Sequence, residues 1–245
     1  MTEPLTATTG PGQTPGDVRR PAVSLIGVTR RFRSGAETVW AVREATLQLA
    51  RGEFACVLGA SGSGKTTLLN LAAGLDSPDE GTVWVGTSDL TRLSEAGRSK
   101  LRLTEIGVVF QDNNLIAEFT AVENVMLPIE VQGVQESRAR RLAEAQLARV
   151  GLAGMGQRLP SHLSGGQQQR VGIARALVGD RKILLADEPT GALDTANSRA
   201  LFELFANLCS QGASVLLATH DPLSRDYVHT LYEMTDGRIG SAAQA

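Results

Sequence analysis

Short apolar runs alternate with longer helix-period segments along the chain, and this pattern predicts an α/β protein. Four runs have the length and composition of short strands. They are residues 53–58, 106–110, 182–186 and 214–219. The first run ends in glycine, and a helical segment at residues 65–73 follows it and is closed by Gly74.

Further strands are predicted toward the two ends of the chain. Residues 23–28 and 38–49 have strand-like apolar patterns joined by a turn at Ser34-Gly35. Residues 81–85 form another short apolar run. Near the C-terminus, residues 228–234 and 237–239 flank Asp236-Gly237, which is typical of a β-hairpin.

Helical patterns dominate from about residue 112 to residue 180. The segments are residues 121–127, 135–150 and 165–178, and one more helix is predicted at 195–210. In the segment 135–150 an apolar stripe of Leu142, Leu147 and Val150 faces polar positions, as in an amphipathic helix. The pattern therefore predicts an α/β core with a helical subdomain inserted at about residues 112–180.

Composition narrows the class of protein. A chain of 245 residues suits one large domain or a domain with an inserted subdomain. No apolar run approaches the roughly 18 residues of a membrane span, so a soluble chain that reaches a membrane only through a partner is expected. The net charge of −2 argues against bulk nucleic-acid binding. Cys56 and Cys209 are predicted to be small buried side chains rather than a disulfide or zinc site.

The first 21 residues are rich in Thr, Pro and Gly and lack the apolar core of a secretory signal. We expect a disordered tail there and one domain over residues 22–245.

The stretch from Gly59 to Thr66 matches G-x-x-x-x-G-K-[ST] in full. Its glycines allow backbone N–H groups to turn inward around phosphate oxygens. Lys65 would reach the β- and γ-phosphates, and the Thr66 hydroxyl would bind Mg²⁺. A Gly/Ser-rich linker is the alternative, but the strand before and the helix after favour a phosphate loop. The assigned residues are Gly59, Ala60, Ser61, Gly62, Ser63, Gly64, Lys65, Thr66 and Thr67.

Two adjacent carboxylates, Asp187 and Glu188, follow the apolar run 183–186. The carboxyl end of a strand is where α/β sheets bind ligands. Asp187 would hold Mg²⁺, and Glu188 would polarise the attacking water. Taken alone, the pair before Pro189 could equally be a solvated strand end; beside a phosphate loop, the catalytic interpretation is favoured.

Ser164 begins the third motif, in the sequence Leu-Ser-Gly-Gly-Gln at residues 163–167. Ser164 is placed to cap the following helix, with Gln167 at the capping-box position. The motif is either a well-capped helix or a second anion site, built from the Ser164 hydroxyl, glycine amides and a helix N-terminus.

These motifs together resemble the nucleotide-binding subunits of ABC ATPases, over residues 22–239. The string at residues 163–167 is that family's signature and separates the chain from other P-loop NTPases. Gln111 follows the run 106–110, Gly191-Ala192-Leu193-Asp194 follows the acidic pair, and His220 follows the run 214–219, in the family's order.

The resemblance implies a P-loop NTPase core with an antiparallel β subdomain and an inserted helical subdomain, with ATP and Mg²⁺ as cofactors. It also implies ATP hydrolysis by a homodimer of two chains stacked head to tail. Each ATP would lie between the phosphate loop of one chain and the signature of the other. The implied signature contacts are Ser164, Gly165, Gly166 and Gln167.

Four further roles are implied in the same way. Gln111 would touch Mg²⁺ or the attacking water, and His220 would contact the γ-phosphate, although a local hydrogen bond is its alternative role. Asp194 would lie beside the nucleotide and could also cap helix 195–210. Phe32 stands where the family places an aromatic ring that stacks on adenine, usually a tyrosine; the alternative is a core aromatic.

The region between Gln111 and the signature resembles one branch of the family. Thr120–Val125 followed by Leu127-Pro128 is similar to the lipoprotein-release, macrolide-efflux and cell-division group. The resemblance implies an integral membrane permease as partner and a peripheral position on the cytoplasmic face of the membrane. It leaves open a non-transport ATPase that regulates cell division or assembly. A nucleic-acid-directed ABC protein is disfavoured, because one chain here carries one nucleotide motif set and no zinc cysteines.

The segment 112–127 mixes apolar and acidic side chains directly after Gln111. We expect Ile116 and Phe119 to form part of a groove for a permease helix, with Glu118 and Glu123 pairing to basic residues on it. Burial of Phe119 inside the helical subdomain is the alternative.

Overall fold

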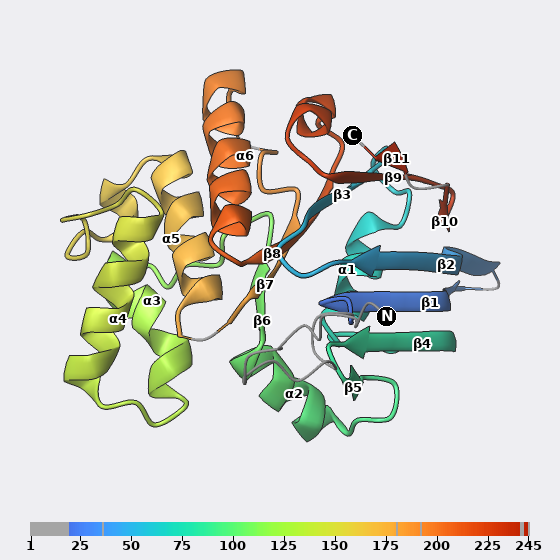
Figure 1. Ribbon diagram of the computed structural model, residues 1–245, viewed down its shortest axis with the longest axis horizontal. Coiled ribbons are helices and arrows are strands. Elements are labelled where there is room, and N and C mark those ends of the chain that lie inside the picture. Colours follow the sequence, from blue (N-terminus) through green and yellow to red (C-terminus); the bar gives the residue numbers. More distant parts are fainter. Residues whose placement is uncertain (1–19, 36, 180, 192, 241–242, 245) are drawn as a thin grey trace, which may run out of the picture.

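The computed structural model describes residues 20–35, 37–179, 181–191, 193–240 and 243–244. Two β-sheets pack around α1 (Lys65–Ala72), and further helices cover the other face of the larger sheet (Figure 1). This architecture confirms the predicted α/β fold class with its antiparallel subdomain and helical insertion. Of the expected tail, residues 1–19 lie outside the described part of the chain.

The larger sheet places the carboxyl ends of its parallel strands along one edge. Its order is β10-β9-β3-β8-β7-β6, where β9, β3, β8, β7 and β6 run parallel. Every residue of the central strand β8 is buried, because this strand is covered on both faces. The strands are β3 (Phe54–Leu58), β6 (Ile106–Val109), β7 (Ile183–Asp187), β8 (Ser214–Thr219), β9 (Thr230–Thr235) and β10 (Arg238–Ile239), and β11 (Ala243–Gln244) pairs with β9.

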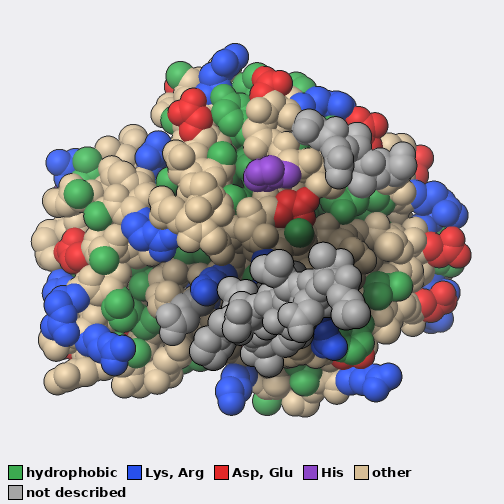
Figure 2. All heavy atoms as spheres, viewed as in Figure 1, with side chains coloured by type: hydrophobic (Ala, Val, Ile, Leu, Met, Phe, Trp, Pro, Cys, Tyr) green, Lys and Arg blue, Asp and Glu red, His purple; other side chains and the backbone are tan. Residues whose placement is uncertain are grey.

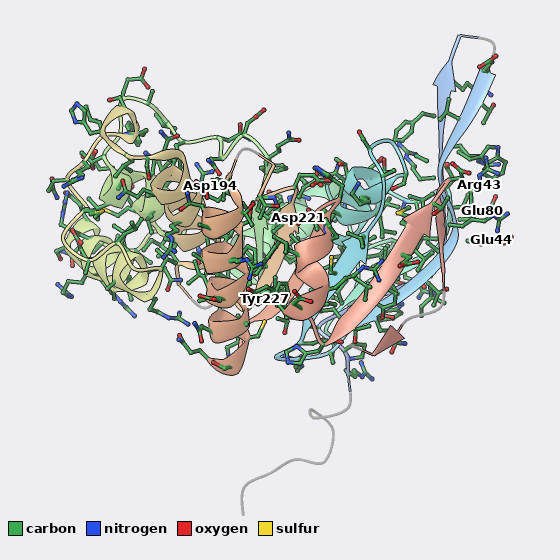
Figure 3. All side chains as sticks on the ribbon, turned by 90° about the horizontal axis from the view of Figure 1, so that it is seen from above. Arg43, Glu44, Glu80, Asp194, Asp221 and Tyr227 are labelled. Atoms are coloured by element: carbon green, nitrogen blue, oxygen red, sulfur yellow. The ribbon has the colours of Figure 1, made fainter. Side chains whose placement is uncertain are left out.

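The smaller sheet is antiparallel and has the order β2-β1-β4-β5. Burial alternates along the second half of β2, so one face of the strand packs inward and the other meets solvent. β1 extends beyond the expected residue 28, and its hairpin with β2 projects past the rest of the sheet (Figure 3). The strands are β1 (Val23–Ser34), β2 (Glu37–Leu49), β4 (Glu80–Val85) and β5 (Ser88–Asp89).

Two hydrophobic cores lie on opposite faces of the larger sheet. One contains α1, the smaller sheet and the side chains that β3, β7 and β8 direct toward them, among them Val57 and Leu185. The other contains the neighbouring side chains of the same strands, such as Cys56 and Leu184, packed against four helices. These helices are α3 (Ala121–Glu130), α4 (Glu136–Arg149), α5 (Gly165–Leu177) and α6 (Thr195–Ser210).

Some elements differ from the pattern-based expectation. The amphipathic helix α2 (Glu95–Thr104) was not predicted, although Ser94 accepts a hydrogen bond from the Gly97 amide as its N-cap. Only Leu101 of this helix is buried, so few apolar positions mark the helix in the sequence. In α4 the stripe includes Leu147 but not Leu142, whose side chain is exposed because Ala139 and Ala143 occupy the inward positions. Two 3₁₀ turns, Pro160–His162 and Pro222–Asp226, complete the described elements.

No helix in the described part of the chain has both the length and the hydropathy of a bilayer span. On the face shown in Figure 2, Lys and Arg side chains lie among Asp and Glu side chains rather than in one continuous basic surface.

Candidate nucleotide-binding site

The glycine-rich loop connects β3 to α1 and is held by close backbone packing. Gly59 donates its N–H to the Thr219 carbonyl at 3.2 Å, which ties the loop to β8. Gly64 is the N-cap of α1 with φ of 106°, and a β-carbon there would collide with the Ala41 carbonyl oxygen. No side chain caps this helix, and the Ser63 hydroxyl is buried without a hydrogen-bond partner among the described residues. The loop therefore offers unused donors to an anion.

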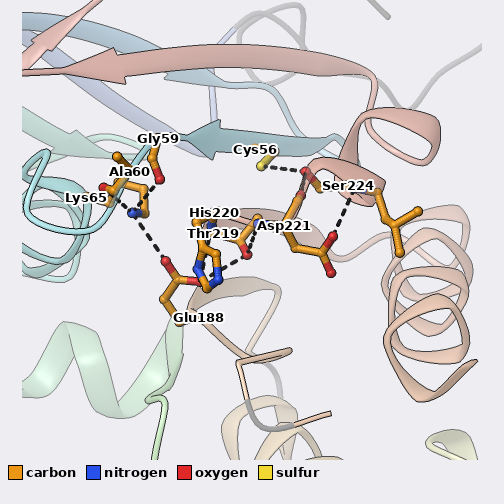
Figure 4. Close-up of polar contacts among 10 residues, drawn as sticks. Cys56, Gly59, Ala60, Lys65, Glu188, Thr219, His220, Asp221 and Ser224 are labelled. Carbon is orange, nitrogen blue, oxygen red and sulfur yellow. Dashed lines mark hydrogen bonds and ion pairs between the residues drawn. The ribbon is translucent and has the colours of Figure 1, made fainter. Parts of the chain in front are cut away.

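Lys65 places a buried positive charge at this loop. Its Nζ donates to the Gly59 carbonyl at 2.9 Å and to the Ala60 carbonyl at 3.0 Å. The same nitrogen lies 3.2 Å from Oε1 of Glu188, with side chains that are only 5% and 14% exposed (Figure 4). Because both charges are shielded from water, the Coulomb attraction between them is screened less than in a surface pair.

Glu188 is held through its second carboxylate oxygen as well. Oε2 accepts hydrogen bonds from the Thr219 hydroxyl at 3.1 Å and the His220 amide at 3.2 Å, and it lies 2.9 Å from His220 Nδ1 (Figure 4). The backbone of Glu188 is left-handed, with φ of 45°. A non-glycine residue keeps such a conformation only where its surroundings determine it, and such residues concentrate at functional sites.

Asp187 supplies a carboxylate suited to a hard cation. Its Oδ1 is buried and has no hydrogen-bond partner in the described structure. Burial is the main cause that raises the pKa of Asp187, while a hydrogen bond from the Thr66 side chain partly offsets this shift. A carboxylate oxygen without a partner beside a hydroxyl matches the oxygen ligands that Mg²⁺ prefers, so these two residues fit the expected metal.

Gln111 comes to the same edge from β6. Its side-chain nitrogen lies 3.8 Å from the position of a β-carbon built on Gly191. Gly191 donates its N–H to the Glu188 carbonyl at 3.1 Å, so Gln111 borders the turn that carries Glu188. The structure thus brings together the phosphate loop, both carboxylates, Gln111 and His220, as the sequence predicted.

The signature residues lie apart from this cluster. Ser164 and Gln167 form the predicted capping box at the start of α5. Figure 1 shows α5 and α1 on opposite sides of the larger sheet. Within the described residues, no hydrogen bond or ion pair joins residues 164–167 to residues 59–67.

The signature borders a cavity of about 260 Å³ that also reaches the start of α6. Ser164, Gly166 and Gln167 line it together with Leu193 and Asn197. Asp194 caps α6 by accepting from the Asn197 amide at 2.8 Å, and Figure 3 places it at that helix end. The capping role of Asp194 is therefore confirmed, while Ala192 of the same motif lies outside the described residues.

Phe32 is a surface residue rather than a core aromatic. Its side chain is 41% exposed, on β1 opposite Val39. The Arg30 guanidinium lies 4.9 Å from the ring centroid and is held by Asp76 at 2.8 Å. An ordered, exposed ring can stack on a flat ligand.

Two features of the site escaped the sequence analysis. Thr219 contributes both its carbonyl, to Gly59, and its hydroxyl, to Glu188. The amide of Gly237 donates to the Ser63 carbonyl at 3.0 Å, so the predicted C-terminal hairpin supports the phosphate loop. The position of Thr219 directly before His220 was a signal for the first; the second depends on tertiary packing that no local pattern encodes.

A glycine loop between a buried parallel strand and a helix, with a buried lysine and two carboxylates at one sheet edge, defines a P-loop nucleotide-binding protein. Residues 42–191 match the family model described as ABC transporter, and the chain belongs to this family. It is an ATPase subunit of the ABC class.

Three similar proteins illustrate the relationship. The lipoprotein-releasing system ATP-binding protein LolD of Saccharophagus degradans is 40% identical over 225 residues, which is 91% of this chain and 99% of that protein. The macrolide export ATP-binding/permease protein MacB of Burkholderia pseudomallei is 40% identical over 219 residues, which is 89% of this chain but 34% of that protein. A dimeric post-hydrolysis structure of the ATP-binding cassette MJ0796, bound to ADP and Pi, superposes with a TM-score of 0.83 at 36% identity and covers 91% of this chain and 98% of that one.

The substitution Asp187→Asn should stabilise the subunit and abolish its Mg²⁺-dependent turnover. Burial disfavours the ionised carboxylate, and removing 1 kcal/mol of that cost raises the melting temperature by about 2–4 °C at this chain length. The pKa of Asp187 is raised in the fold, so its ionisation opposes folding as pH rises above the ordinary value of 3.8. The stability gap between the variant and the natural chain should therefore grow with pH from that value upward. Thermal melts at several pH values measure it, and a variant less stable at neutral pH would contradict the assignment.

Proposed function

We propose that this chain powers an exporter-type or mechanically coupled transporter, as a homodimer bound peripherally to an integral membrane permease on the cytoplasmic face of the membrane. The main support for this proposal is the cluster of Lys65, Asp187, Glu188 and His220 at one edge of the larger sheet. The signature helix lies on the opposite side of that sheet from α1. The similarity to LolD over 99% of its length supports the role of the ATP-binding component, and the macrolide export ATP-binding/permease relative is matched over 34% of its length.

Each residue of the cluster has a role in this proposal. Lys65 and the loop amides bind the β- and γ-phosphates, while Thr66, Asp187 and Gln111 hold Mg²⁺, which supplies positive charge to the phosphate oxygens. Glu188 accepts the proton of the attacking water, and His220 orients Glu188 and the γ-phosphate. Phosphate oxygens at Lys65 would compete with the ion pair to Glu188, so substrate binding would free the carboxylate for its work.

The signature would act on the nucleotide of the partner subunit. Residues 164–167 make no hydrogen bond to the phosphate loop of their own chain within the described structure. The exposed N-terminus of α5 and its glycines can instead meet phosphate from a second chain stacked head to tail. Phe32 would stack on adenine in its own subunit, and Asp194 would lie near the shared nucleotide.

The segment that faces the permease is shaped by one buried side chain. Asn124, which is 0% exposed, accepts from the Ile116 amide at 2.8 Å and donates to the carbonyls of Ile116 and Phe119 at 3.0 Å each. Ile116 is 38% exposed, and Phe119 is half-buried and outside both hydrophobic cores. Apolar side chains on a rigid, exposed loop can anchor a partner helix.

Glu123 also has a local role in this segment. Glu123 closes the capping box of α3, where its Oε2 accepts from the Thr120 amide at 2.8 Å and from the Thr120 hydroxyl at 2.6 Å. These hydrogen bonds lower the pKa of Glu123 and occupy its Oε2 at the helix end, so only Oε1 is left for the proposed pairing with a permease. Glu118, which is exposed, remains the acidic residue proposed to pair with a basic side chain of the partner.

The substitution Glu188→Gln should lower the rate of ATP hydrolysis by about 10²–10⁴-fold, the range for a positioned general base. ATP binding should persist, because Lys65, Thr66 and Asp187 remain, and ATP-bound dimers should accumulate in size-exclusion chromatography. Phosphate release measures the rate, and Glu203→Gln on the exposed side of α6 is the control. Hydrolysis at the natural rate would exclude Glu188 as the base.

Mixing a Lys65→Ala chain with a Ser164→Arg chain should restore part of the ATPase activity that each variant lacks alone. In a mixed dimer one site carries both defects and the other carries none, because phosphate loop and signature come from different chains. Pull-down through two different tags confirms that mixed dimers form. Absence of recovery in confirmed mixed dimers would rule out a shared site.

The substitution Glu118→Arg should leave basal ATPase activity and the melting temperature of the isolated subunit unchanged. In the complex reconstituted with its permease, partner-stimulated turnover should fall by about fivefold or more, a typical coupling effect between sites. Glu203→Arg is the matched control, since it makes the same charge change on a helix distant in sequence. Full stimulation in the Glu118 variant would place the permease contact elsewhere.

A further inference from the structure

The turn that follows Gln111 is held in an uncommon conformation. Asn113 and Asn114 are consecutive left-handed residues, with φ of 45° and 46°. Asparagine tolerates this region better than most residues, but two in a row need outside support. The Oδ1 atom of Asn113 is buried and has no partner in the described structure, so this side chain does not provide it.

Arg175, near the end of α5, provides that support. Its Nη2 donates to the Asn113 carbonyl at 2.6 Å and its Nη1 to the Asn114 carbonyl at 2.7 Å. One planar guanidinium thus bonds both carbonyls of the turn, a forked geometry that lysine cannot reproduce. Burial lowers the pKa of Arg175, and no ion pair to it occurs among the described residues, so the carbonyls of the turn are its main partners.

The strand before the turn is fixed to α5 by other means. A β-carbon on Gly107 of β6 would collide with the Ala176 carbonyl, so strand and helix are in direct backbone contact there. Arg181 donates to the Leu103 carbonyl at 3.1 Å, at the other end of β6. Loss of Arg175 would therefore release the turn while β6 stays in place.

We propose that Arg175 is a positioning residue, which fixes the Asn113–Asn114 turn to α5 and so holds Gln111 against the turn that carries Glu188. α5, the helix whose N-cap is the signature residue Ser164, then also fixes the position of Gln111 in its own subunit. This inference rests on the proposed function only for the role of Gln111. The contact between Arg175 and the Asn113–Asn114 turn requires no nucleotide.

Hydrogen exchange of the full chain, without nucleotide, tests the contact first. In Arg175→Gln, peptides covering residues 111–116 should exchange about tenfold faster, which corresponds to about 1.4 kcal/mol of lost local stability, while peptides of α5 and β7 change less than about twofold. Arg170→Gln, which removes a partly buried arginine of the same helix that donates to the Val150 carbonyl at 2.9 Å, is the matched control and should leave residues 111–116 unchanged. Unaltered exchange in the Arg175 variant, or equal acceleration in both variants or across the whole chain, would overturn the proposal.

Steady-state kinetics then separate positioning from a purely structural contact. Arg175→Gln should lower kcat about tenfold with the KM for ATP within about twofold, because Gln111 acts on the reacting end of ATP rather than on its binding. Arg175→Lys should recover part of kcat, since it keeps the charge but not the fork; it also carries the test if the glutamine variant does not fold. If exchange of residues 111–116 changes but kcat stays at the natural value, Arg175 has only a structural role and the positioning role is wrong. A failed base assignment would instead show as natural hydrolysis in Glu188→Gln, whatever the exchange result.

Discussion

The rest of the site depends on the ion pair between Lys65 and Glu188. Two opposite charges, 3.2 Å apart and largely shielded from water, persist only when each is fixed by further hydrogen bonds. Two carbonyls of the glycine loop fix the lysine, and Thr219 and His220 fix the carboxylate. These groups come from three neighbouring strands, so the pair requires β3, β8 and β7 to end at one level of the sheet.

The packing of the parallel sheet provides that alignment. Its central strands are buried on both faces, and each face has a separate hydrophobic core. On one face α1 fills the space to the smaller sheet, where Gly64 permits contact with the Ala41 carbonyl. A side chain at that glycine would push the helix away from the sheet, and the N–H groups of the loop would no longer face the phosphates.

The fold class and most residues of the cluster could be predicted from the sequence alone. The phosphate loop, the acidic strand end and the signature are each specified by a short contiguous motif. The supports of these motifs were not predictable. Thr219, Gly237 and Arg175 contribute through atoms that meet only after the chain has folded. α2 buries a single residue, so few apolar positions mark it in the sequence. Roles that depend on a second chain, a nucleotide or a permease lie beyond what one subunit displays.

The separation of the two cores has an evolutionary consequence. The chemistry at the phosphate loop depends on α1 and the smaller sheet, whereas α3, α4 and the loop that Asn124 shapes belong to the other face. Substitutions can accumulate on the helical face, and alter what the subunit docks to, without disturbing the geometry that binds phosphate. A phosphate-binding core of this design can thus be shared by proteins named for different tasks, such as lipoprotein release and macrolide export.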